Sequence, residues 1–116
     1  MPSKEVARKN DDVDTMHNAI GGDDCNTKNI IIHTATYSDN VFIDGQPVIR
    51  NGDVCDLHNN GLECVLHNPP LKASSISIFV NGKAIGRIYD LFVEKNPEAP
   101  PCNAKIISGS STVFAG

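Results

Sequence analysis

The chain has 116 residues, four cysteines, no tryptophan and a formal net charge of −4. A chain of this length forms one domain with a modest core, so residues 1–116 are treated as a single domain that needs an additional cross-link. Lys and Arg are not clustered, which excludes nucleic acid as the main partner because phosphate binding needs such clusters.

The N-terminal segment carries no apolar run of signal-peptide length, and the longest apolar stretch, Ile30–Ile32, is too short to span a bilayer. We therefore expect synthesis in the cytoplasm without a signal peptide. Release from the cell would then depend on another machine.

An internal repeat organises the chain. Residues 41–53 align with residues 78–90 at a constant offset of 37, as from position 42 to 79 and from 50 to 87. Residues 6–11 match the second half of this unit, and residues 112–116 match its first half. The sequence therefore predicts half a repeat, two whole repeats and another half, with the two halves completing one unit if the termini meet.

Each whole repeat contains a hairpin signal. Asp44-Gly45 and Asn81-Gly82 favour type I′ turns, and short β-rich runs flank both dipeptides. No segment shows a helical period over three turns, and residues 29–33 and 105–107 are typical of strands. The predicted fold class is all-β, built from hairpins that share a core.

A second similarity follows the hairpin units. The segments DVDTMHN and DVCDLHN carry His17 and His58, and a cysteine follows each of them, Cys25 in the first case and Cys64 in the second. The third copy keeps Cys102 without a histidine. In a reducing compartment, cysteine together with histidine indicates metal binding before disulfide formation.

Taken together, these motifs resemble the PAAR-repeat family. Residues 48–53 stand where the family has its P-V-A-R-x-G-D signature, the two Phe-x-[Asp/Asn]-Gly-[Gln/Lys] hairpins repeat in register, and residues 107–114 are close to the family's closing motif. The resemblance covers residues 6–116. Tyr89 departs from it by standing where the family has a glycine, and residues 97–101 look inserted.

The resemblance implies a small cone of β-hairpin repeats with pseudo-threefold symmetry. The family's cone caps and sharpens a trimeric β-helical spike, and one structural metal ion, usually zinc, locks its tip. Such caps serve contractile phage tails and type VI secretion systems, and contact the target membrane transiently during injection. The expected location is a virion tail tip or a secreted injection apparatus, and the sequence leaves both open.

The resemblance also implies a set of metal ligands, because loops from the three repeats converge at the family's tip. It assigns His17, His58 and Cys102. The fourth ligand stays open: Cys64 is preferred as the nearest soft ligand in the loop of His58, and Cys25, its repeat mate, is the alternate. Zinc is the expected ion, and iron also suits a site of histidine and cysteine.

Other assignments stay open at this point. His33 and His67 sit at strand ends and are interpreted as surface or hydrogen-bonded residues rather than ligands. Cys55 is either a packed thiol or a ligand. A disulfide between Cys25 and Cys64 is an alternative for a particle that matures outside the cell.

The proposed binding face is the broad base of the cone. It would consist of apolar hairpin residues, namely Val41, Phe42, Ile78, Phe79, Val113 and Phe114. Against this, the phenylalanines of the two whole repeats, Phe42 and Phe79, are expected in the core.

The preferred function is mechanical rather than enzymatic. The alternatives are a small zinc-binding effector carrier or adaptor, a zinc hydrolase and a secreted disulfide module. The chain lacks the H-E-x-x-H and G-x-S-x-G patterns that would support a hydrolase.

Overall fold

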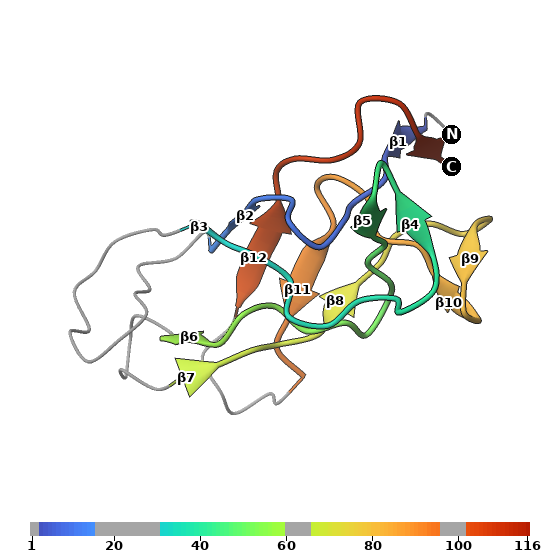
Figure 1. Cartoon of the computed structure of the whole chain (residues 1–116). Coiled ribbons are helices and arrows are strands. Elements are labelled where there is room, and N and C mark those ends of the chain that lie inside the picture. Colours follow the sequence, from blue (N-terminus) through green and yellow to red (C-terminus); the bar gives the residue numbers. More distant parts are fainter. Residues whose placement is uncertain (1–2, 16–30, 60–65, 96–101) are drawn as a thin grey trace.

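The computed structural model describes residues 3–15, 31–59, 66–95 and 102–116, and these residues form short strands without any helix (Figure 1). This confirms the all-β prediction. In chain order the strands are β1 (Lys4–Glu5), β2 (Val13–Asp14), β3 (Ile31–Ile32), β4 (Phe42–Ile43), β5 (Gln46–Pro47), β6 (His58–Asn59), β7 (Leu66–His67), β8 (Leu71–Lys72), β9 (Phe79–Val80), β10 (Lys83–Ala84), β11 (Leu91–Val93), β12 (Asn103–Ile106) and β13 (Phe114–Ala115).

Strands β4–β5 and β9–β10 form the two predicted hairpins. Asp44 and Gly45 have φ angles of 55° and 76°, and Asn81 and Gly82 have φ angles of 54° and 77°. Two successive positive φ values define a type I′ turn, whose twist matches that of the flanking strands. The dipeptides Asp-Gly and Asn-Gly therefore form the hairpin turns that the sequence predicted.

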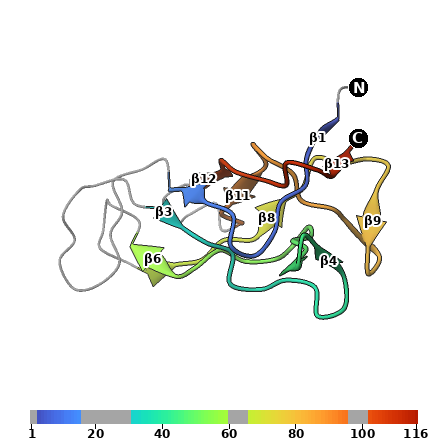
Figure 2. The ribbon, with the colours of Figure 1, turned by 45° about the horizontal axis from the view of Figure 1, so that its top comes forward.

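The two ends of the chain build a third hairpin-like unit. Strand β1 pairs antiparallel with β13, with Lys4 opposite Ala115 and Glu5 opposite Phe114. Figures 1 and 2 both show β1 and β13 side by side. This confirms that the two half repeats complete one unit.

A closed ring of backbone hydrogen bonds joins the three units. Ala7 N donates to Gly86 O (2.9 Å), Gly86 N donates to Ile49 O (2.8 Å), and Ile49 N donates to Ala7 O (3.2 Å). A second cyclic set of three hydrogen bonds joins the same units. Lys9 N donates to Pro47 O, Asn51 N donates to Ala84 O, and Ile88 N donates to Glu5 O. Each unit is thus bonded to both others, while the conical shape and pseudo-threefold symmetry of the whole domain stay a prediction.

An Arg-x-x-Asp turn follows this ring in each unit. Arg50 N and Arg50 Nε both donate to Asp53 Oδ2, at 2.7 and 3.0 Å, and Asp53 N donates back to Arg50 O at 3.0 Å. Arg8 and Asp11 repeat the same contacts at the same distances. The motif therefore stabilises a turn through its own side chains.

The third turn departs from the other two. Arg87 N still donates to Asp90 Oδ2 (2.9 Å), but the guanidinium donates to Ala115 O (3.1 Å) and Ser74 Oγ (2.6 Å) instead. Tyr89 has a φ of 72° where its repeat mate Gly52 has 87°. The missing glycine is thus replaced by a residue held in the left-handed region, which costs about 1–2 kcal/mol.

Five strands form the largest sheet, in the antiparallel order β3-β2-β12-β11-β8. One face of this sheet supplies the main core, in which Phe92, Leu71, Ile106 and Val13 are buried. A smaller core under the hairpins contains Val48 and its neighbours. In Figure 1 the three hairpin units lie at one end of the sheet, and β6–β7 lies towards the other end.

The expectation that Phe42 and Phe79 belong to the core is wrong. Phe42, Phe79 and their counterpart Phe114 are 56%, 60% and 52% exposed. Their strand neighbours Val80 and Ala115 are buried in the smaller core. Because successive side chains of a strand point to opposite faces, burying those neighbours turns the phenylalanines outward.

Candidate metal site

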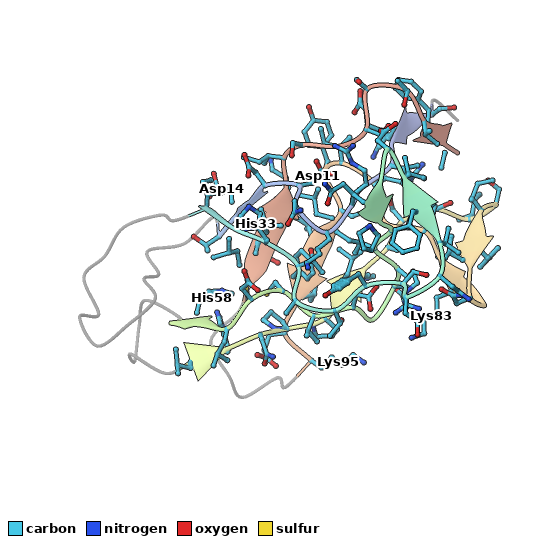
Figure 3. All side chains as sticks on the ribbon, in the orientation of Figure 1. Asp11, Asp14, His33, His58, Lys83 and Lys95 are labelled. Carbon is cyan, nitrogen blue, oxygen red and sulfur yellow. The ribbon has the colours of Figure 1, made fainter. Side chains whose placement is uncertain are left out.

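The β6–β7 ladder places two histidines opposite each other. His58 opens β6, His67 closes β7, and the two residues are directly paired across the ladder. Their Nε2 atoms lie 2.8 Å apart, and the rings meet edge to face with centroids 4.3 Å apart. Figure 3 shows His58 on β6, beside β7.

Cys102 completes a group of three donor atoms. It immediately precedes β12, and its Sγ lies 3.6 Å from His58 Nε2. The ligand atoms of His58, His67 and Cys102 all lie within 4.8 Å of one another. His58 is 0% exposed and Cys102 is 1% exposed, whereas His67 is partly buried. Such a group can hold a metal ion.

The backbone orients the imidazole of His58. Its Nδ1 lies 2.8 Å from the carbonyl oxygen of Asp56, and a carbonyl only accepts, so Nδ1 carries the proton. Burial lowers the pKa of His58, which keeps the ring neutral. The Nε2 lone pair therefore faces His67 and Cys102, as a metal ligand requires.

Burial shifts the pKa of Cys102 in the opposite direction from that of His58. It raises the pKa of Cys102 to about 11, with the nearby charge of Glu94 acting in the same direction. Without a cation beside it the side chain is a thiol at neutral pH. A metal ion would bind the thiolate, so binding must release this proton.

The spacing of these atoms can be compared with a tetrahedral zinc centre. Zn–S and Zn–N bonds of about 2.3 and 2.05 Å place sulfur and nitrogen about 3.6 Å apart, and two nitrogens about 3.3 Å apart. The distance from Cys102 Sγ to His58 Nε2 is 3.6 Å, and the Nε2–Nε2 distance is 2.8 Å. The donor set fits zinc after the two rings separate by about half an ångström.

Two of the predicted ligands, His58 and Cys102, are brought together by the fold. His17, Cys64 and the alternate Cys25 lie outside the described residues. His67 was not among the predicted ligands. His67 reaches the site through the register in which β7 pairs with β6. That register could be read from the sequence only if the turn between the two strands were known.

The remaining histidine and cysteine of the described residues behave differently. His33 is exposed, as expected, and its Nε2 lies 3.4 Å from Asp12 Oδ1. Cys55 Sγ lies 3.9 Å from His58 Nδ1, the ring nitrogen that faces away from Cys102. Burial raises the pKa of Cys55, which keeps its side chain a thiol. The geometry thus favours Cys55 as a packed thiol.

No protein-family model matches the chain, and no curated protein matches it. Within the described residues, no helix is long and apolar enough to cross a membrane.

Proposed function

We propose that the protein is a spike-tip cap of the PAAR-repeat kind. It sits on the end of a trimeric β-helical spike in a contractile injection machine, and a structural zinc ion locks the end that carries the β6–β7 hairpin. The observation that carries this proposal is the exposure of Phe42, Phe79 and Phe114 at one equivalent position in three cyclically bonded units.

Three equivalent apolar side chains suit a partner that presents the same pocket three times. Phe42 lies opposite Pro47 in its unit, Phe79 lies opposite Ala84, and Phe114 lies opposite Glu5. A trimer offers three copies of one surface around its axis, so each copy would receive one phenylalanine. Exposed large apolar side chains that recur in this way mark an interaction surface.

The candidate metal site supports a structural role. His58 is fully buried and Cys102 nearly so, and the β6–β7 ladder around them is only two residues long on each side. An isolated ladder of this length has little stability of its own. A zinc ion that joins β6–β7 to the start of β12 would add its binding free energy to the stability of this end. The role is mechanical rather than catalytic.

The docking experiment mixes the purified chain with a purified trimeric β-helical spike protein from the same genome. Size-exclusion chromatography with light scattering should give one cap chain per spike trimer. The triple variant Phe42→Ser/Phe79→Ser/Phe114→Ser should lose the complex, whereas Leu57→Ser should keep it. Leu57 is a matched control because it is 55% exposed but lies next to His58 at the other end.

A complex with three cap chains per trimer, or a triple variant that still binds, would contradict the cap proposal. The metal component is tested separately by native mass spectrometry and metal analysis, which should find one zinc ion per chain. Hydrolytic turnover that depends on this zinc would favour the zinc hydrolase alternative instead.

A further inference from the structure

A groove on the side of the domain lies outside both the hairpin surface and the candidate metal site. Two hollows of about 420 and 330 Å³ adjoin each other along β8 and β11, and both are lined by Lys72 and Val93. Lys95 lines the first hollow, and Lys4 and Tyr89 line the second. We call the two together the lysine groove.

Strand register places part of the lysine groove on the outer face of the five-stranded sheet. Lys72 of β8 is paired with Leu91 of β11, and Leu91 is paired with Lys105 of β12. The neighbouring row, Leu71 with Phe92, is buried in the core. Lys72, Leu91 and Lys105 therefore share the opposite face and present an apolar side chain between two lysines.

The lysine groove is basic although the whole chain is acidic. Lys4, Lys72 and Lys95 line it, in a protein whose formal net charge is −4. Two carboxylates also line it among the described residues. Asp90 is buried and accepts hydrogen bonds within its own turn, and Glu94 is partly buried. Three lysines against two carboxylates leave the groove with a formal charge of +1, and of these groups the buried Asp90 presents least to a ligand.

Tyr89 forms one wall of the lysine groove in an unfavourable backbone conformation. It is 55% exposed and has a φ of 72°, a region that glycine adopts at the equivalent position in the second repeat. Lys105 Nζ lies 5.7 Å from the centroid of its ring. Backbone strain of this kind clusters at functional sites.

We propose that the lysine groove binds an extended, acidic segment of a partner protein. The carboxylates of the segment would pair with Lys4, Lys72 and Lys95. Its apolar side chains would lie on Leu91 and Val93, against the ring of Tyr89. This site goes beyond the cap proposal and does not depend on it, because the groove lies beside β8 and β11 rather than on the three exposed phenylalanines.

The test uses the full chain and a fluorescein-labelled synthetic peptide of about eight residues that alternates Glu and Val, so that carboxylates and apolar groups face opposite sides. Fluorescence anisotropy should show saturable binding that weakens with added salt. Lys72→Glu should weaken binding by about tenfold, because it replaces an attractive charge with one that repels the carboxylates of the peptide. The matched control Lys83→Glu, an exposed lysine of β10 (Figure 3), should leave it unchanged.

A second variant separates binding from folding. Tyr89→Gly should weaken peptide binding at least fivefold while raising the midpoint of urea denaturation, since it removes the aromatic wall and relieves the positive φ. The proposal is overturned if the peptide does not bind at millimolar concentration or if Lys72→Glu binds it unchanged. Equal binding of a peptide that alternates Lys and Val, or of an oligothymidine of the same length, would also overturn it.

Discussion

His58 and His67 share a single hydrogen bond between their Nε2 atoms, which lie 2.8 Å apart across the β6–β7 ladder. Because His58 carries its proton on Nδ1, His67 donates from Nε2 in this arrangement. Metal binding would move that proton of His67 to Nδ1 and replace the hydrogen bond with two metal–nitrogen bonds. The β6–β7 ladder thus holds the two ring nitrogens close enough to share one ion.

Replacing His67 should reduce metal binding without unfolding the domain. His67→Ala removes one of the three described ligands, and we expect zinc affinity to fall at least tenfold. His33→Ala is the matched control, because His33 is an exposed histidine directly after β3 and is not part of the candidate site. Competition with a colorimetric zinc chelator measures both variants. Equal zinc affinity for the wild type and His67→Ala would remove His67 from the site.

Zinc uptake should depend on pH through Cys102. The pKa of its thiol is about 11, so a proton must leave whenever zinc binds at neutral pH. Releasing one proton makes the apparent affinity rise about tenfold for each pH unit between roughly 6 and 8. Calorimetric titrations in buffers of different ionisation enthalpy would count the protons released. Binding that releases no proton over this range would contradict a thiolate ligand.

Asp44 should make stability sensitive to acid. Ser110, Thr112 and Arg8 all donate to its carboxylate, and these contacts lower its pKa. A lowered pKa contributes stability that is fully present above the unfolded value of about 3.9 and is lost as pH falls through the folded value. Denaturation midpoints of the wild type and Asp44→Asn should therefore differ at about pH 6 and converge as the pH falls through the folded-state pKa of Asp44.

Asparagine is a conservative replacement at this turn, because Asn81 occupies the equivalent position. Arg50 Nη1 and Ser38 Oγ donate to Asn81 Oδ1 at 3.1 and 2.8 Å. The Asp44→Asn variant should therefore fold, and its midpoint should vary less with pH in the acid range. A difference from the wild type that stays constant from pH 6 to 2 would show that ionisation of Asp44 is not involved.

Gly86 should not tolerate a side chain. A Cβ there would lie 2.9 Å from Leu71 Cδ2 and 3.1 Å from Ile49 O, the oxygen to which Gly86 N donates. Gly86→Ala would push against the ring of hydrogen bonds, and we expect it to lower the free energy of unfolding by about 1–3 kcal/mol. Urea denaturation measures this change. An unchanged midpoint would mean that Leu71 moves aside at little cost.

Local signals in the sequence were sufficient for the repeats and their turns. Asp44-Gly45 and Asn81-Gly82 form type I′ turns because the backbone needs two positive φ values there, and few other residue pairs adopt them without strain. The matches of residues 6–11 and 112–116 to the two halves of the repeat also predicted that the chain ends could complete a third unit, and β1 pairs with β13 as this requires.

Side-chain direction was not available from the sequence. Phe42 and Phe79 were expected in the core. Instead, Val80 takes the buried side of β9 beside Phe79, as Ala115 does beside Phe114 in β13. In strands of two residues no alternating pattern is long enough to fix which face is buried. Only the packing of the three units around one ring decides it.

Only part of the candidate metal site was predicted from the sequence. The resemblance and the repeat context pointed to His58 and Cys102 as candidate ligands. His67 joins them only because the β6–β7 register sets it opposite His58, and Cys102 arrives from 44 positions along the chain. The sequence by itself determined the two hairpins, since turn chemistry is local, and it indicated that the terminal half repeats could pair. Which side chains meet at the metal site was decided only by the tertiary structure, because that depends on strand register and on long-range packing.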